Sequence, residues 1–392
     1  MNHIDVIIVG AGAAGLLCAI EAGARGRHVL ILEKSNKVGK KILMSGGGRC
    51  NFTNIYTTPQ QYLSQNPHFC KSALNRYTPP AFIDLVEHHR IAYYEKTLGQ
   101  LFCEQKSIQI VEMLLNECRS HHVDIQLNQT ITSVEKKNDT FIVTTNDAHY
   151  QCQSLVIASG GLSIPTLGSS PFGYHIAEQF GITVHPLRAG LVPLTWHQHD
   201  KLRFESLSGI SIDSRITSHG KTFEESLLFT HRGLSGPAVL QISSYWQPGD
   251  ELIITLLPQL DLYKELNEKQ IKHGDSALKT MLSQHYPKRL LTVFFESTLL
   301  DKPLKQLSQN DLKNIAHHLQ HWRITPNGTE GYRTAEVTLG GVDCNELSSQ
   351  RMEAKKVPGL FFIGEVIDVS GWLGGYNFQW AWASGWAAGQ VV

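Results

Sequence analysis

The chain has 392 residues, more than most single domains, so we expect two domains or one domain with an insertion. Its 35 basic and 35 acidic residues cancel, and no basic run is dense enough to indicate a nucleic-acid partner. Seven scattered cysteines without a C-x-x-C pair are typical of free thiols in a reducing cytoplasm. With no signal peptide and no long apolar span, we expect a cytoplasmic protein that binds neither nucleic acid nor membranes.

The N-terminal segment carries the pattern of a dinucleotide-binding unit. Asp5–Val9 is a short apolar run, typical of a strand buried on both faces of a parallel sheet. The glycines of a G-x-G-x-x-G motif follow at once. Gly10 permits a tight turn, Gly12 lets the backbone approach a pyrophosphate, and Gly15 lets the next helix pack close to the strand. The N-terminus of that helix is expected to bind the phosphates.

A second strand is predicted over Arg27–Leu32, and it places Glu33 at its carboxyl end. A carboxylate at this distance from the glycine motif can accept hydrogen bonds from ribose hydroxyls. Because Glu33 would repel a phosphorylated ribose, the site should prefer FAD or NAD to NADP.

A run of three glycines begins the next distinctive motif, which reads Ser45-Gly-Gly-Gly-Arg-Cys-Asn51. Such a loop cannot continue a helix or strand without cost, and it lets a ligand lie against bare backbone. We expect it to lie under the pyrophosphate and flavin, with Arg49 as a partner of a phosphate or a substrate anion. The alternative is a flexible surface turn.

The following segment alternates helices and strands. Helices are predicted over Tyr77–His89 and Ser107–Arg119, and short strands between Val123 and Tyr150. A further buried strand runs from Ser154 into Gly160 and Gly161, a turn that should face the same nucleotide. No second glycine motif follows a strand, so a separate NAD(P) domain is not expected.

From Pro186 to about Glu336 the pattern becomes β-rich, as in an inserted domain, and Leu191–Leu194 is one of its strand-like runs. Two helices are predicted within it, over Leu262–His273 and Asp311–Trp322. His317 and His321 share a face of the second helix, but without a third ligand we favour a solvated surface over a metal site. The turn Phe229–Pro237 carries His231 and Arg232, and it is either a plain loop or one that faces the substrate.

The C-terminal segment contains one last buried strand, Gly359–Glu365, a glycine loop, Gly371–Asn377, and a helix of small residues. Small residues allow this helix to pack closely against its neighbour. Its N-terminal amides could meet a partial negative charge such as a flavin carbonyl oxygen. The segment would then position a ring whose N1–C2=O region gains charge on reduction.

These motifs, together with Thr338-Leu-Gly-Gly-Val342, resemble those of bacterial FAD-binding proteins described as aminoacetone-oxidase-like or bile-acid-reductase-like. The resemblance implies an α/β fold, in which a glutathione-reductase-type (Rossmann-like) FAD-binding domain is interrupted by an insert with a β-barrel and a small helical part. The FAD domain would comprise 1–187 and 336–392, the insert 188–335, and the helical part about 260–325.

The resemblance and the motifs together predict non-covalent FAD and no metal. The resemblance implies that Ala14, Glu33 and Lys34 lie near the adenosine half and Ile131 near adenine. It places Gly160, Gly364, Tyr376 and Asn377 near the flavin half. The full set of expected FAD-binding residues is Gly10, Gly12, Ala13, Ala14, Gly15, Glu33, Lys34, Ser45, Gly46, Gly47, Arg49, Asn51, Ile131, Ala158, Gly160, Gly364, Glu365, Asp368, Gly375, Tyr376, Asn377 and Phe378.

The expected function is an FAD-dependent oxidoreductase. Flavin N5 would pass a hydride to or from a small organic substrate at the junction of the FAD domain and the insert, with NAD(P)H as a transient donor. Arg49, Cys50, His231 and Arg232 are the candidates for substrate orientation or proton transfer. Two alternatives stay open: an oxidase of a small amine that uses O₂, and a flavin-binding redox sensor. A flavin enzyme that modifies tRNA is disfavoured by the charge balance.

Overall fold

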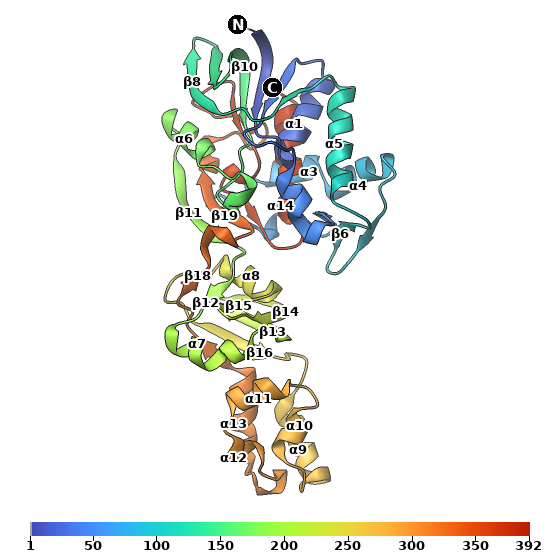
Figure 1. The fold of residues 1–392 in the computed structure, drawn as a ribbon, viewed down its shortest axis with the longest axis vertical. Helices are drawn as coiled ribbons and strands as arrows, with labels where there is room; N and C mark the ends of the chain where they lie inside the picture. Colours follow the sequence, from blue (N-terminus) through green and yellow to red (C-terminus); the bar gives the residue numbers. More distant parts are fainter. Residues whose placement is uncertain (1) are drawn as a thin grey trace. The chain divides into compact units, whose positions relative to one another are not determined.

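A computed structural model describes residues 2–392, with side chains from Ile4 onward. The chain divides into two compact units. The first consists of Met1–Ala189 with Glu336–Val392, and the second of Gly190–Ala335. Each unit has its own sheet (Figure 1).

The first unit is built on a sheet that, among residues 2–392, contains seven strands. Its order is β7 (Asp124–Gln126), β2 (Val29–Leu32), β1 (Asn2–Val9), β10 (His149–Ile157), β9 (Thr140–Thr145) and β8 (Ile131–Lys137), with β20 (Leu360–Phe362) pairing with β10. The strands β7, β2, β1, β10 and β20 run parallel, whereas β8 and β9 are antiparallel additions. The carboxyl ends of β1, β2 and β10 therefore meet at one edge, since Val9 pairs with both Leu32 and Ile157.

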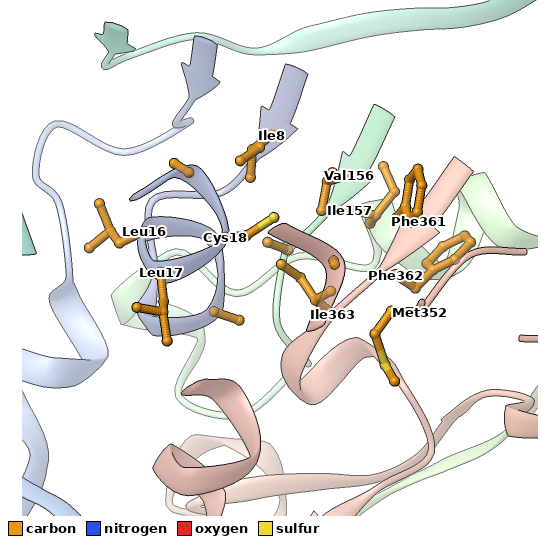
Figure 2. Close-up of a cluster of buried hydrophobic side chains, with 14 of the residues drawn as sticks. Ile8, Leu16, Leu17, Cys18, Val156, Ile157, Met352, Phe361, Phe362 and Ile363 are labelled. Atoms are coloured by element: carbon orange, nitrogen blue, oxygen red, sulfur yellow. The ribbon is translucent and has the colours of Figure 1, made fainter. Parts of the chain in front are cut away.

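Helix α1 (Ala13–Ala24) packs on strands of this sheet, and α14 (Tyr376–Gly389) packs on α1. Their contact depends on glycine, because a Cβ atom at Gly385 would lie 2.4 Å from the carbonyl oxygen of Ala14. Figure 2 shows buried side chains from β1, α1, β10 and β20, among them Ile8, Cys18 and Phe361, and the Cys18 side chain points toward the segment that carries Ile363. The C-terminal segment thus completes the core begun by the N-terminal one.

The remaining elements of the first unit surround this core. The helices are α2 (Lys40–Met44), α3 (Lys71–Arg76), α4 (Pro79–His88), α5 (Ile108–Ser120) and α6 (Phe172–Gln179). Smaller sheets pair β3 (Asn51–Asn54) with β6 (Gln100–Cys103) and β5 (Tyr93–Glu95), β4 (Tyr62–Leu63) with β21 (Ser370–Gly371), and β11 (Val184–Gly190) with β19 (Val337–Val342).

The second unit contains, among the described residues, a sheet of seven strands and a group of helices. The strand order is β17 (Trp322–Ile324), β16 (Leu252–Leu256), β13 (Ser211–Ser218), β14 (Lys221–Phe229), β15 (Gly233–Ser235), β12 (Leu194–Thr195) and β18 (Gly328–Thr329). The helices are α7 (Gln198–Phe204), α8 (Pro237–Ser243), α9 (Leu262–His273), α10 (Leu278–Leu282), α11 (Lys288–Phe294), α12 (Ser297–Leu300) and α13 (Gln309–Gln320). The barrel that the resemblance implies stays a prediction.

One strand predicted in the second unit is much shorter in the structure. The apolar run that begins at Leu191 forms a strand only from Leu194. Leu191 adopts a left-handed backbone conformation, and the amides of Leu191 and Val192 donate to the hydroxyls of Ser244 and Ser243. Side-chain oxygens therefore satisfy the donors that a sheet ladder would have satisfied.

Candidate functional site

The turn between β1 and α1 has the geometry of a dinucleotide-binding loop. Gly10 has a φ of 111°, and a Cβ atom there would lie 2.5 Å from the carbonyl oxygen of Ala158. A Cβ at Gly15 would lie 2.0 Å from the oxygen of Gly10, whereas one at Gly12 would meet nothing within 4 Å. The turn is thus compact on its inner side and open at Gly12, where backbone amides at the start of α1 have no partner within the helix.

Glu33 follows β2 and lies against this turn. Its Oε2 accepts from the backbone N–H of Ala11 at 2.7 Å, and its Oε1 accepts from that of Ser35 at 2.7 Å. The backbone N–H of Gln129 donates to the backbone carbonyl of Glu33. This hydrogen bond places the residues just before Ile131 next to Glu33. Lys34 is exposed and Ile131 is half-buried. The two bonds fix a half-buried carboxylate next to the glycine turn, where a ribose hydroxyl could reach it.

The glycine run after α2 forms a turn with its backbone exposed. Gly46 and Gly47 have φ values of 57° and 64°, which favour glycine. A Cβ at Gly47 would meet nothing within 4 Å, whereas one at Gly46 would lie 2.8 Å from the Phe102 ring. Ser45 is tied into the end of α2, since its Oγ donates to the Ile42 carbonyl at 2.8 Å. This turn offers bare main chain on one side and is packed on the other.

An ion pair that the sequence reasoning missed joins the loops around Gly160 and Gly364. Lys41 Nζ lies 2.6 Å from Glu365 Oε2 and 2.7 Å from Ser163 Oγ. The other oxygen, Glu365 Oε1, accepts from Ser163 Oγ at 3.0 Å and from Thr338 N–H at 2.9 Å. The network connects α2, the turn after β10, β19 and the 3-10 turn Gly364–Val366.

Only weak signals could have revealed this pair. Lys41 and Glu365 are 324 positions apart, and no sequence spacing relates them. Glu365 is one of the expected FAD-binding residues, and Thr338 begins one of the motifs that carry the family resemblance. No motif includes Lys41 or Ser163. Their meeting depends on the way β10 and β20 pair in the sheet.

The residues at the C-terminus that are expected to face the flavin mostly make hydrogen bonds and ring contacts with other parts of the chain. Asn377 accepts from the Gly371 N–H at 2.8 Å and donates to the Gly371 carbonyl at 2.9 Å, which closes the glycine loop. Tyr376 is buried, and its carbonyl accepts from Tyr62 Oη at 2.9 Å. Phe378 stacks on Trp382 with centroids 5.7 Å apart. These contacts shape the loop at the start of α14, and a direct role toward FAD stays a prediction.

The remaining expected FAD residues are packed around the two glycine turns. Gly364 lies on the start of α1, since a Cβ there would be 3.0 Å from that of Ala14. A Cβ at Gly375 would lie 2.4 Å from the Thr53 carbonyl oxygen and 2.9 Å from the side-chain amide of Asn51. Asp368 accepts from the Gln65 N–H at 2.7 Å, and burial raises the pKa of its carboxyl group.

Of the two catalytic candidates in the first unit, only Arg49 is accessible. Arg49 is exposed, and its Nη1 donates to Tyr94 Oη at 3.2 Å. Cys50 is fully buried, and burial raises the pKa of its thiol far above the ordinary value. A buried thiol that stays protonated is a poor nucleophile. We therefore correct the expectation for Cys50 and assign it to the core.

The same argument predicts how the cysteines respond to a thiol reagent. All seven lie within the described residues, where each is buried with a free thiol, and burial raises the pKa of Cys103 to about 11 and of Cys118 to about 12. In native protein, Ellman's reagent should react only at the rate of local opening, whereas all seven thiols should react at once in denaturant. If mass mapping showed that the reagent labels Cys50 rapidly in native protein, the assignment of Cys50 to the core would be contradicted.

The other two candidates lie in the second unit, on the turn between β14 and β15. His231 and Arg232 are both exposed, and Arg232 Nη1 lies 3.6 Å from Glu330 Oε2. Thr230 Oγ1 accepts from the backbone N–H groups of Arg232 and Gly233 at 3.3 and 3.0 Å. The turn is therefore ordered by its own hydrogen bonds, and the role of both side chains toward a substrate stays a prediction.

Residues 2–392 contain neither a metal-binding cluster nor a membrane-spanning helix. No three His, Cys, Asp or Glu side chains come together there as a metal ion would require. None of the helices in that part of the chain has the length and apolar character needed to cross a bilayer.

Taken together, the turn residues fit a dinucleotide. Inside the turn, Gly10 and Gly15 have no space for a side chain, whereas Gly12 and Gly47 face open space. This combination leaves backbone amides accessible beside the Glu33 carboxylate, as pyrophosphate and ribose require.

Comparison with known proteins extends this result. A family model described as HI0933-like protein Rossmann domain matches residues 4–391. A protein of Escherichia coli (strain K12) named ribosomal RNA dihydrouridine synthase is 58% identical over 392 residues, covering 100% of this chain and 98% of that protein. A Clostridium scindens protein named 3-dehydro-bile acid delta(4,6)-reductase is 27% identical over 412 residues, covering 100% of this chain and 99% of that protein.

Among solved structures, the Mycobacterium smegmatis Sdh1 complex in the apo form has a TM-score of 0.50 and 16% identity, covering 99% of this chain and 67% of that chain. At this identity the likeness shows the fold alone.

The E. coli relative corrects one expectation. We expected a small-molecule substrate and no nucleic acid, but the name of this relative describes an enzyme that acts on ribosomal RNA. The expectation was wrong because a net charge of zero is an average over the chain and does not report local groups of cations. The likeness to aminoacetone oxidases, the NAD(P)H donor and the cytoplasmic location stay predictions.

The relatives are enzymes, and one of them is a reductase by name. The glycine turn, the acidic residue after β2 and the parallel sheet agree with the family model over nearly the whole chain. This chain is therefore a flavoprotein oxidoreductase with a Rossmann-type FAD-binding α/β fold, and it belongs to the HI0933-like protein Rossmann domain family.

Proposed function

We propose that this protein is an FAD-dependent reductase that converts uridine in ribosomal RNA to dihydrouridine, with NADH or NADPH as the source of electrons. The observation that carries the proposal is the 58% identity, over the whole chain, to the E. coli protein of that name. The accessible glycine turns and the fixed carboxylate of Glu33 support it, because they provide the cofactor site that such a reduction needs.

The residues that would hold FAD follow from the geometry of the first unit. The amides at Gly12, Ala13 and Ala14 would bind the pyrophosphate, and Glu33 would accept from the adenosine ribose. The exposed main chain at Gly46 and Gly47 would lie along the ring side. When bound, FAD supplies a hydride from N5.

The reduction requires an electron-poor carbon and a proton. In uracil the C5–C6 double bond is conjugated with the C4 carbonyl, so C6 accepts the hydride and C5 accepts the proton as the double bond is lost. A base in a folded RNA must leave its stack to be reached. Arg49 is suited to hold a phosphate or a uracil oxygen, and since a guanidinium keeps its proton it does not serve as the acid.

Lys41 and Glu365 have a positioning role in this proposal. Their ion pair joins four segments of the chain, including those that carry Gly160 and Gly364. If these loops place the reacting groups, loss of the pair should misplace them, and small displacements reduce rates strongly.

The test is nucleoside mass spectrometry of ribosomal RNA that lacks dihydrouridine, after anaerobic incubation with FAD-loaded protein and NADH or NADPH. We expect dihydrouridine to appear at a defined uridine. Lys41→Met should slow its formation about tenfold or more, which corresponds to about 1.4 kcal/mol in the barrier, whereas Lys40→Met, which removes the neighbouring ammonium, should have little effect. No dihydrouridine with either donor would overturn the proposal.

A further inference from the structure

Two arginines and three histidines of the second unit are linked by ring contacts and a hydrogen bond across α7, α13 and β17. Arg203 lies over the Phe204 ring. The Phe294 ring lies 5.9 Å from that of Phe204 and 5.7 Å from that of His318. The rings of His317 and His321 are 4.8 Å apart, and His321 Nε2 lies 3.0 Å from Arg323 Nη2. We call these five residues the Arg203–Arg323 track.

The track is exposed, and its side chains are held in place by aromatic rings. All of its members are exposed except His321, which is half-buried. The Arg203 guanidinium lies 5.0 Å from the centre of the Phe204 ring, and the His318 ring lies 5.4 Å from that of Phe295. Side chains fixed in this way lose less entropy when they bind a ligand.

The charges around the track favour an anionic ligand. One carboxylate, Glu251, pairs with Arg323 at 2.8 Å and neutralises that end in part. Burial, together with Arg203 and His317, lowers the pKa of His318, so its imidazole is mostly neutral near pH 7 and donates through a ring N–H.

A neighbouring helix adds two cations to the same region. α11 begins with Lys288 and Arg289, both exposed. Arg289 Nη2 donates at 2.9 Å to the carbonyl of Ser208, which follows α7 by a short turn. The positive side chains of α7 and α11 therefore lie along one stretch of backbone.

We propose that the Arg203–Arg323 track binds the phosphate backbone of the RNA that contains the target uridine. The inference rests on the proposed function, from which it takes its ligand. Arginines present paired donors that match phosphate oxygens, and contacts of this kind supply most of the affinity for a nucleic-acid backbone. The simpler interpretation is that α13 presents an ordinary solvated surface. This interpretation explains the exposed histidines of α13, but it does not explain why Arg203, from a different helix, α7, is linked to them.

The test measures binding of a fluorescein-labelled RNA hairpin of ribosomal sequence to the full FAD-loaded chain, by anisotropy over a range of salt concentrations. The variant is R203Q/R323Q, which keeps much of the side-chain packing. The matched control is R215Q/K221Q, which removes two cations of the same unit, the half-buried Arg215 of β13 and the exposed Lys221 of β14. Thermal unfolding and the flavin spectrum are measured for each variant to verify that both remain folded.

We expect R203Q/R323Q to weaken RNA binding roughly tenfold or more near 0.1 M salt and to reduce the slope of log K against log salt by about 1.5. The control should change both values little. Equal binding by the track variant and wild type, equal losses in both variants, or absence of RNA binding by wild type would overturn the inference. Competition by poly-glutamate as strong as by RNA would also overturn it, in favour of an acidic protein partner.

The outcomes separate this inference from the proposed function. If wild type binds RNA through the track but forms no dihydrouridine, the proposed function fails and the track stands. If dihydrouridine forms and the track variant binds RNA as wild type does, only the track fails.

Discussion

Replacement of Gly12 with Asp should lower the affinity for FAD roughly a hundredfold, a loss of about 2.7 kcal/mol, and leave the fold intact. A Cβ atom at Gly12 would meet no atom within 4 Å, and the φ of −87° suits any residue. The substitution should therefore not strain the turn. It would, however, place a carboxylate where the amides of α1 are expected to bind the pyrophosphate, and like charges in that position repel.

The control for this variant is Ala24→Asp, which adds the same charge at the exposed C-terminal end of the same helix. It should cost no more than about 1 kcal/mol of stability through the helix dipole and leave FAD binding unchanged. Fluorescence titration of the apoprotein with FAD gives the dissociation constants, and urea unfolding of the apoprotein gives the stabilities. If Gly12→Asp bound FAD with wild-type affinity, the pyrophosphate would not bind at this turn.

Replacement of Gly385 with Ala should destabilise the protein by about 2–3 kcal/mol, because two helix backbones meet at that residue. Helix propensity alone predicts the opposite sign, since Ala is favoured over Gly by about 1 kcal/mol in a helix interior. A Cβ at Gly385 would lie 2.4 Å from the Ala14 carbonyl oxygen, and neither α14 nor α1 can yield without moving its core contacts.

Urea unfolding of Gly385→Ala measures this difference, with Asn314→Ala as the control. Asn314 is an exposed residue of α13, so its replacement should stabilise slightly through propensity. If Gly385→Ala were as stable as wild type or more stable, α14 would not pack on α1 as described. FAD affinity should fall as well, since Ala14 belongs to the first turn of α1.

Local patterns were sufficient to predict the parts of the fold that depend on neighbouring residues. Gly10, Gly12 and Gly15 between two apolar runs predicted the strand, turn and helix, because each glycine satisfies a local steric need. The predicted helix Leu262–His273 coincides with α9. The predicted strand at Leu191 is shorter because the hydroxyls of Ser243, in α8, and of Ser244 accept hydrogen bonds from the backbone amides of Val192 and Leu191. The sequence pattern does not reveal these acceptors.

The candidate site was predicted only where a motif marks it. The Lys41 and Glu365 pair depends on strand order in the sheet, which no spacing encodes, and Cys50 was chosen for its place in a glycine loop although its side chain points into the core. The partner was predicted wrongly because total charge was used in place of its distribution. Arg203 and the histidines of α13 are linked only in the folded second unit, through the rings of Phe204 and Phe294.

The most direct test of FAD-dependent reduction of ribosomal RNA is a single-turnover experiment. The protein with its flavin reduced under anaerobic conditions is mixed with ribosomal RNA that lacks dihydrouridine, and the visible spectrum is followed while the nucleosides are analysed. The account predicts that the oxidised flavin bands return and that dihydrouridine forms in equal amount. Flavin bands that stay bleached with this RNA, with no dihydrouridine formed, would contradict it.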